Sequence, residues 1–327
     1  MKKLLLTGFI VSVAVSSVLA RPLAPVAYNA FDGIAPGAHA LGMGLAAVAV
    51  GNDTSDVYYN PAGLALLKAD NMLGISFEAA RQSELNTDQL FSQDTLKDTN
   101  ITMLSLCNSK GALSWRPIAN YTSSSTTSGG WSNNEVHIDA FTLSATQTDD
   151  KITNGLNLSY LYGRIGHAAI DNGVPSANIA NGNGISLGYG LLYNLSPMFR
   201  FGISANNICA FMWWDDFEAQ QLPFSFRAGI AYQLSNMVTF AYDFEKEYYR
   251  DDPILTQNHF GLEQNIGDIL KLRLGVYGPN MNDLEVTHYT AGLGYSKDNV
   301  SFDLSGEKYR LDNSDVYRIV LGLSVPL

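Results

Sequence analysis

Residues Gly37 to Leu67 read GAHALGMGLAAVAVGNDTSDVYYNPAGLALL, and this stretch differs in character from everything that follows it. It is rich in glycine and alanine, it lacks the alternation of a β-strand, and it contains the turn sequence Tyr-Tyr-Asn-Pro-Ala-Gly. Proline suits the first position of a helix, so a short helical turn is expected after Asn60. Small residues allow close packing against a wall. We therefore predict that residues 21–70 form a hatch and that residues 71–327 form the wall around it.

The rest of the chain is a series of short segments in which apolar and polar residues alternate, as they do in half-buried β-strands. Near 269–278, for example, Leu272 and Leu274 fall on one face, and Lys271 and Arg273 fall on the other. Single-chain bacterial barrels have an even number of strands, and this chain has fourteen candidates. They lie near 71–81, 99–107, 110–120, 134–149, 151–163, 182–194, 198–206, 224–234, 236–246, 257–265, 269–278, 287–297, 299–308 and 317–327.

The connections separate a barrel from a soluble β-sandwich, whose strands also alternate. Short links at 108–109, 149–150, 194–197, 235–236, 266–268 and 297–298 take turns with mostly longer ones at 82–98, 121–133, 164–181, 207–223, 247–256, 279–286 and 309–316. Short periplasmic turns and longer outer loops produce this rhythm. Fourteen strands enclose a lumen too wide for wall side chains to fill. The expected fold is all-β, a 14-stranded antiparallel transmembrane β-barrel whose lumen is plugged by the N-terminal hatch.

The N-terminus and the composition agree with an outer-membrane location. Residues 1–20 combine Lys2 and Lys3, an apolar centre and the ending Val18-Leu19-Ala20, which predicts a signal peptide. The formal net charge of −11 argues against nucleic acid as a partner, because a phosphate backbone would be repelled. Charged residues make up 16% of the chain, below the usual quarter, as expected for a protein whose outside faces lipid.

The stretch that precedes the barrel resembles a known family. Its pattern is Gly37-Ala38-x-Ala40-Leu41-Gly42-Met43-Gly44, then Asn52-Asp53 and Tyr59-Asn60-Pro61-Ala62-Gly63-Leu64. It resembles the start of FadL-like outer-membrane proteins, which include long-chain fatty acid transporters and PorV-type proteins of type IX secretion. The resemblance marks Asn60, Pro61, Ala62 and Gly63 as the hatch motif. For a transporter it implies an apolar loop groove that captures substrate and a kinked third strand that opens sideways.

Two features of the sequence bear on the kinked strand and the apolar groove that the resemblance implies. Pro117 interrupts the third predicted strand, and proline cannot donate to a β-ladder. Pro117 therefore predicts a local gap in the wall, unless it lies at the outer end of the strand. The second feature is the loop ICAFMWWDDF, residues 208–217, with Phe211, Met212, Trp213, Trp214 and Phe217. An exposed apolar cluster marks a binding surface; the alternative is a loop folded back on its neighbours.

Alternation places several cations on the inward faces, and we name Arg227 and Arg273 as candidates to bind a carboxylate headgroup. Inward carboxylates and a histidine offer the alternative that these cations form charge pairs between wall and hatch; they are His137, Asp139, Asp243, Glu263, Asp303 and Glu307. No catalytic residue, metal site or cofactor is predicted, since the five histidines are scattered without paired spacing.

These observations predict an outer-membrane channel for passive uptake of hydrophobic small molecules, with long-chain fatty acids as the first guess. The expected partners are the hydrophobic ligand and outer-membrane lipid. The alternative is a PorV-like shuttle or scaffold that binds a secreted protein and transports no small molecule.

Overall fold

The computed structural model describes residue 24 and residues 35–82, 100–127, 130–235, 237–248, 254–311 and 313–327. The predicted signal peptide, residues 1–20, lies outside the described residues. Within these described residues, three short helices come first and strands follow. The helices are α1 (Ala38–Gly42), α2 (Asp56–Tyr59) and the 3-10 helix η2 (Pro61–Leu66).

Sixteen strands are found in the described part of the chain, and most lie within a few residues of the predicted segments. They are β1 (Met72–Gln82), β2 (Asn100–Asn108), β3 (Gly111–Thr127), β4 (Gly130–Asp149), β5 (Ile152–Asp171), β6 (Val174–Asn194), β7 (Phe199–Asn206), β8 (Phe211–Trp214), β9 (Gln220–Gln221), β10 (Phe224–Ser235), β11 (Val238–Tyr248), β12 (Leu255–Ile266), β13 (Leu270–Gly278), β14 (His288–Lys297), β15 (Val300–Leu311) and β16 (Ser314–Pro326).

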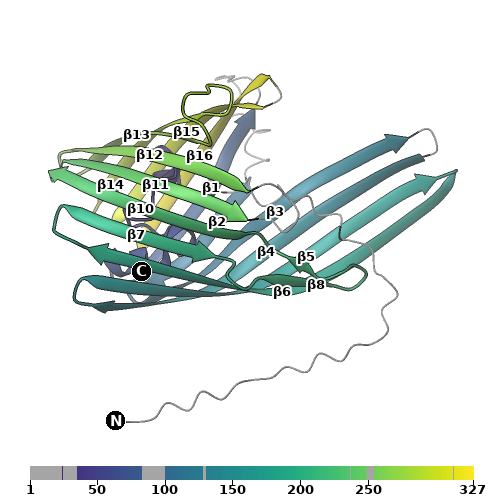
Figure 1. Cartoon of the computed structure of the whole chain (residues 1–327), viewed down its shortest axis with the longest axis horizontal. Helices are drawn as coiled ribbons and strands as arrows, with labels where there is room; N and C mark the ends of the chain where they lie inside the picture. The colour runs from purple at the N-terminus through teal and green to yellow at the C-terminus, as the bar shows by residue number, and fades with distance from the viewer. Residues whose placement is uncertain are drawn as a thin grey trace, which may run out of the picture.

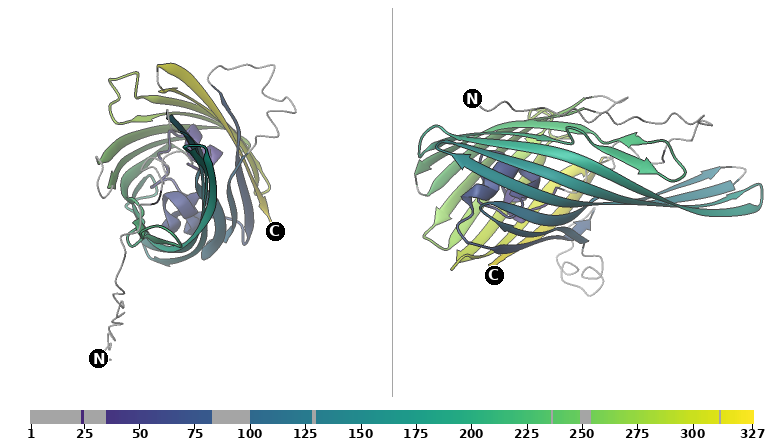
Figure 2. Two further views of the ribbon diagram at one scale, coloured as in Figure 1. Left: turned by 90° about the vertical axis from the view of Figure 1, so that its right-hand side faces the viewer. Right: turned by 90° about the horizontal axis from the view of Figure 1, so that it is seen from below.

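Fourteen of the described strands close into one antiparallel barrel (Figures 1 and 2). Each strand from β1 to β7 and from β10 to β16 pairs with its neighbours, and the ring is completed where β1 pairs with β16, from Met72 opposite Pro326 onward. The two remaining strands, β8 and β9, form a small hairpin beside the outer half of β6. The predicted 14-stranded antiparallel barrel is confirmed.

The two faces of the wall differ as alternation predicts. On β13, Leu272 and Leu274 point outward and are 41% and 59% exposed, whereas Arg273 between them points inward and is 3% exposed. The same outward band recurs around the ring, for example at Phe240, Phe260 and Leu293. An antiparallel barrel with an apolar exterior band is the structure by which strands cross lipid, so this is a protein of the bacterial outer membrane. No described helix has the length and apolar character to cross a membrane.

Strands β3 to β6 are much longer than the rest of the barrel. They have 17, 20, 20 and 21 residues, against 8 in β7 and 9 in β13. Roughly 9–11 residues cross a membrane, so these strands extend past one end of the barrel as two joined hairpins, which we call the arm (Figure 1). The predicted loops at 121–133 and 164–181 are therefore wrong. Residues 122–126 are all serine or threonine and so carry no apolar alternation, because above the membrane neither face meets lipid.

A bulge at Pro117 marks a change in the wall. The pairing of β3 with β4 shifts by one residue between Pro117 and Ala119. On the other side, the described ladder between β2 and β3 starts at Asn108 opposite Gly111 and ends at Leu104 opposite Trp115. β2 nevertheless continues to pair with β1 as far as Asn100. In the described residues, β2 and β3 therefore separate at the level of Pro117.

Residues 35–70, the inner segment, lie inside the barrel (Figure 2). Leu41, Leu45 and Tyr59 are almost fully buried and pack in one cluster with Val320 of β16. At Gly275 of β13 the inner segment comes so close that a Cβ would lie less than 3.0 Å from the backbone nitrogen of Gly44. The small residues of the opening stretch thus allow backbone-to-backbone packing against the wall.

Candidate functional site

Polar side chains of the wall hold the inner segment in place. Asp243 of β11 accepts hydrogen bonds from the backbone nitrogens of Ala47 and Val48 at 2.7 and 2.9 Å. Ser305 of β15 donates to the carbonyl oxygen of Ala38 at 2.6 Å. His259 of β12 contacts the carbonyl oxygen of Gly44 at 3.0 Å. Because these wall groups are buried, each contact satisfies backbone that water does not reach.

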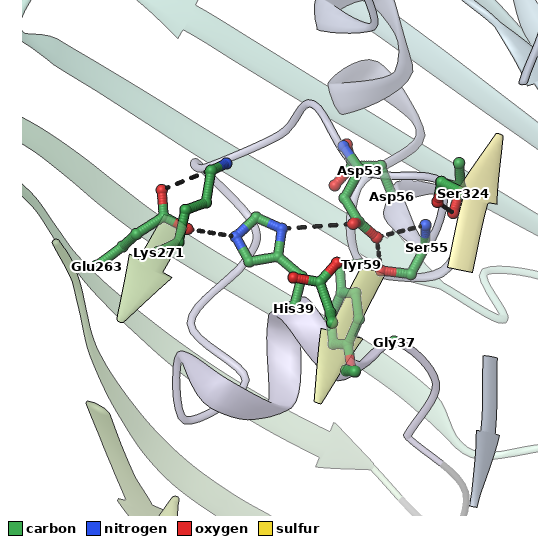
Figure 3. A network of polar contacts seen from close by, with 12 residues as sticks. Gly37, His39, Asp53, Ser55, Asp56, Tyr59, Glu263, Lys271 and Ser324 are labelled. Carbon is green, nitrogen blue, oxygen red and sulfur yellow. Dashed lines mark hydrogen bonds and ion pairs between the residues drawn. The ribbon is translucent and has the colours of Figure 1, made fainter. Parts of the chain in front are cut away.

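His39 of α1 makes an ionic contact with the wall (Figure 3). Its Nδ1 lies 3.4 Å from a carboxylate oxygen of Asp53, and its Nε2 lies 3.3 Å from one of Glu263 on β12. Burial and the charge of Arg273 disfavour the protonated ring, but the close carboxylates of Asp53 and Glu263 outweigh them and raise the pKa of His39 to about 9. A charged imidazole therefore joins two carboxylates at neutral pH, one in the inner segment and one in the wall.

The hatch motif forms a helix start. Asn60 caps η2, since its Oδ1 accepts from the backbone nitrogen of Ala62 at 3.1 Å, and Pro61 occupies the first helical position. The Nδ2 of Asn60 donates to the carbonyl oxygens of Val48 and Leu191, the latter on β6. Gly63 is buried beside the carboxyl group of Asp56. The motif thus holds the inner segment against β6; its role as a movable hatch stays a prediction.

Beside the inner segment, the wall encloses a cavity of about 90 Å³, which we call the lumen pocket. Tyr58 of α2 lines one side of it, Met103 of β2 and Arg116 of β3 line another, and Leu161 of β5 a third. Arg116 lies with its guanidinium carbon 4.2 Å from the centre of the Tyr58 ring, a cation–π contact. Met103 and Arg116 belong to the two strands that separate near Pro117, so the pocket lies beside that break.

An apolar cluster adjoins the lumen pocket, and loop residues of the predicted site contribute to it. Met212 and Trp214 of β8 are buried and pack with Ile118, Leu161 and Leu222, which also line the pocket. We call this cluster the roof. Phe217 is partly buried against it.

The predicted loop, residues 208–217, is therefore partly exposed, as a binding surface would be, and partly folded back on its neighbours. Phe211 and Trp213 are 41% and 52% exposed and stack on each other with ring centres 6.3 Å apart on the outer surface. Met212 and Trp214 instead fold back into the mouth of the barrel. β8 is a strand, so its side chains alternate. Whether any of these five residues captures a ligand stays a prediction.

The two predicted headgroup cations lie inside the barrel but outside the lining of the lumen pocket. Arg227 places Nε 2.5 Å from Glu245 on the neighbouring strand. Arg273 places Nε 2.7 Å from Glu263 and Nη1 2.5 Å from Asp303. Both are thus in charge pairs that join neighbouring strands. Each also reaches the inner segment, because Glu263 contacts His39 and Arg227 lies 5.5 Å from the centre of the Tyr59 ring. Their role as a headgroup site stays a prediction.

The expected inward position of His137 and Asp139 is wrong. They form a pair with 2.9 Å between Nε2 and Oδ2, as residues that share a face can, but they lie on the same outward face as Phe141. The intervening Ile138 points into the roof cluster instead. Polar residues face inward where lipid surrounds the barrel, but here the inward face packs against Met212 and Trp214, so the apolar residues turn inward.

The similarity of this chain to known proteins is found in its fold and not in its sequence. No protein-family model matches the sequence, and no curated protein matches it. Among solved structures, a monoaromatic hydrocarbon channel, CymD, superposes with a TM-score of 0.62 at 18% identity over 90% of this chain and 98% of that one. The Pseudomonas putida toluene transporter TodX has a TM-score of 0.60 at 12% identity, over 88% and 97% of the two chains. A Pseudomonas aeruginosa FadL homologue has a TM-score of 0.53 at 11% identity, over 93% and 99%.

The protein has the FadL-type fold. The likeness extends over nearly the full length of each of these chains, so the FadL-like resemblance of the opening stretch is confirmed at the level of the fold.

Within this FadL-type fold, the sequence patterns did not predict the residues that line the lumen pocket. Arg116 is one of several inward cations, and nothing in the sequence placed it over Tyr58. Asn157 and Ser159 of β5 line the pocket, and Asn157 donates to the carbonyl oxygen of Val57. Alternation along β5 was the available signal, since 157, 159 and 161 share one face. No sequence pattern predicted that Leu222 lines the same pocket as Asn157 and Ser159.

Proposed function

We propose that this protein is a passive outer-membrane channel for hydrophobic small molecules. The observation that carries the proposal is the lumen pocket, which lies between the inner segment and an apolar roof at the point where β2 and β3 separate. Two structures with the same fold are described as a monoaromatic hydrocarbon channel and a toluene transporter, which supports this class of substrate.

The size of the pocket favours a ligand of about one aromatic ring over a long acyl chain. Its volume is about 90 Å³, and an apolar cavity of about 150 Å³ in an unrelated protein holds benzene. A single ring therefore requires a modest widening, whereas a long-chain fatty acid requires the inner segment or the roof to move away. We accordingly place small hydrophobic molecules ahead of the fatty acids that the sequence suggested.

The proposed path leads from the outer mouth to the lumen pocket and then sideways. The roof covers the pocket on the side of β8, and Met103 and Arg116 flank the break between β2 and β3 on the other. Because the ladder ends at Leu104 opposite Trp115, a molecule in the pocket meets a part of the wall that no described backbone pair closes. Passive movement into the membrane requires no energy source.

Uptake by whole cells tests the proposal. A Gram-negative host that produces the protein in its outer membrane is expected to accumulate radiolabelled toluene faster than the same strain with an empty vector. Ala140 lines the pocket and is 5% exposed, so Ala140→Phe fills the cavity and is expected to return uptake to the vector level. Ala145→Phe on the lipid-facing side of the same strand is the matched control and is expected to keep uptake.

Heat-modifiable migration in gels shows that each variant is folded. Toluene uptake equal to the empty-vector strain, with folded protein in the outer membrane, would contradict the channel proposal. Equal uptake by the Ala140→Phe and Ala145→Phe proteins would leave a channel but move its path away from the lumen pocket.

One observation favours the second candidate, a PorV-like scaffold for a secreted protein. The arm extends beyond the barrel by about ten residues per strand, or roughly 30 Å of extended chain. A channel for small molecules has no evident need of such a sheet. A secreted protein that co-purifies with the intact chain and is lost when the arm is shortened would support this candidate.

A further inference from the structure

The lumen pocket combines an apolar side with a polar one, and this division bears on the ligand. Ile118, Leu161 and Leu222 face it from the roof. Eleven of its nineteen lining residues have polar or charged side chains, among them Tyr58, Arg116, Thr142, Ser159 and Glu247. A pocket built for a pure hydrocarbon gains nothing from such groups, because a hydrocarbon displaces their water and returns no hydrogen bond.

Most of these polar groups already have structural partners. Asn157 and Asn206 donate to the carbonyl oxygens of Val57 and Tyr58 at 2.7 and 3.2 Å, which fixes α2 beside the pocket. Ser186 donates to Asn207 at 2.8 Å. These groups hold the structure together, and their presence alone does not select a ligand.

Thr142 and Ser159 are two adjacent hydroxyl groups on the pocket wall, and the bond between them leaves hydrogen-bonding capacity unused. Their hydroxyl oxygens lie 2.8 Å apart, and either can be the donor. Two hydroxyl groups carry two O–H donors, and one bond between them uses only one. The pair therefore presents a spare donor and spare lone pairs on the inward faces of β4 and β5, where both residues line the pocket.

The lining of the lumen pocket carries one positive and one negative side chain, so its formal charges cancel. Arg116 contributes one cation and Glu247 one anion, and Arg116 lies over the ring of Tyr58. A full negative charge on the ligand would meet the carboxylate of Glu247 as well as the guanidinium group. The lining therefore suits an uncharged ligand better than an aromatic carboxylate.

We propose that the preferred ligand of the lumen pocket is a small uncharged aromatic molecule with a hydroxyl group, whose ring lies under the roof and whose hydroxyl bonds to Thr142 and Ser159. The inference rests on the proposed channel function and names its substrate class. A phenolic hydroxyl both donates and accepts, which matches the spare donor and lone pairs of the pair.

Calorimetric titration of the purified, detergent-solubilised protein with toluene, p-cresol and benzoate tests this inference. Toluene and p-cresol differ only by the hydroxyl group. The Ala140→Phe protein, with its pocket filled, measures the partition of each compound into the micelles. We expect p-cresol to bind about tenfold more tightly than toluene, as one or two added neutral hydrogen bonds imply. Benzoate is expected to bind more weakly than p-cresol.

A double variant tests which side chains carry the preference. In Thr142→Val/Ser159→Ala the ratio of p-cresol to toluene affinity is expected to fall to within about twofold. The matched control is Thr148→Val/Thr153→Val, which removes a similar hydroxyl pair, 3.1 Å apart, on the same two strands outside the pocket. The control is expected to keep the tenfold ratio.

The outcomes separate the two proposals. Equal affinities for toluene and p-cresol would overturn the hydroxyl preference and leave the hydrophobic channel standing. Tighter binding of benzoate would overturn the uncharged class. A preference that survives in the double variant would overturn its assignment to Thr142 and Ser159. Folded protein that binds none of the three compounds would count against the channel proposal itself.

Discussion

His39 illustrates how single side chains of the inner segment decide where it rests. Its ring lies between Asp53 of its own segment and Glu263 of the wall (Figure 3). Burial opposes the charge on Asp53, but the neighbouring His39 ring and hydrogen bonds from Ser55 lower the pKa of that carboxyl well below its usual value. The result is a buried ionic contact that depends on one proton, and it lies among the short turns at one end of the barrel.

That proton makes the anchoring of the inner segment dependent on pH. Folding raises the pKa of His39 from 6.5 to about 9, so its contribution is complete below about pH 6.5 and is lost as the pH rises through about 9. A shift of this size corresponds to something on the order of 3 kcal/mol. We expect hydrogen exchange of the inner segment to accelerate between pH 7 and 10 beyond the intrinsic base-catalysed rate.

The His39→Gln protein supplies the control for this prediction. It lacks the titrating ring, so its inner segment is expected to exchange faster at pH 7 and to show no further acceleration of this kind. A wild-type protein whose protection is unchanged from pH 7 to 10 would contradict the role of the His39 charge.

At the scale of elements, the close contact between the inner segment and strands β12 and β13 requires glycine at two positions of the wall. Gly275 on β13 and Gly261 on β12 are opposite each other in the ladder, and both face the turn at Met43 and Gly44. A Cβ at either position would lie closer than 3.0 Å to backbone atoms of that turn, and backbone cannot rotate aside as a side chain can. The strands thus fit the inner segment as a matched surface.

Gly275→Ala is expected to weaken that fit. The added methyl group overpacks a tight contact, which costs roughly 1–3 kcal/mol, and the inner segment should become more accessible to protease at an unchanged barrel structure. Gly306→Ala on β15 is the matched control, because a Cβ there would meet nothing nearer than 4.0 Å. Equal protease resistance of the two variants would show that the contact at Gly44 carries no weight.

At the scale of the whole molecule, the arm is the continuation of four of the fourteen barrel strands, and its surroundings differ from those of the barrel. In the membrane, β5 presents Leu156 and Leu158 to lipid, 59% and 53% exposed. In the arm, the sequence of β3 becomes Thr-Ser-Ser-Ser-Thr. Cross-strand pairs such as Ser124 opposite Asn133 continue the ladder of the barrel into the arm. On β6, Asn178 also donates to Asp216 of the loop after β8 at 2.9 Å.

Shortening the arm is therefore expected to leave the barrel intact. Replacing residues 124–133 with Asn-Gly joins Ser123 to Asn134, which face each other in the ladder, through the two-residue turn that suits a hairpin. The shortened protein should keep its heat-modifiable migration and its thermal midpoint. By contrast, Leu158→Arg in the lipid-facing band should cost about 2–4 kcal/mol. A shortened protein that fails to fold would show that the arm directs closure of the barrel.

The sequence by itself determined the features that repeat. Alternation with period two and the rhythm of the connections specify strand number, order and the outward face, because lipid acts on every outward residue in the same way. The opening stretch likewise predicted a packed segment, and Pro61 begins η2 as expected.

Only the tertiary structure decided the features that arise where particular residues of different strands meet. The bulge at Pro117 and the end of the ladder at Trp115 follow from how β2, β3 and β4 meet, and that meeting involves residues far apart in the chain. Arg116 lies over Tyr58, and Trp214 packs in the roof, because side chains from several strands occupy one shared volume. Local patterns record which face a residue occupies, but not which residues of other strands it meets there.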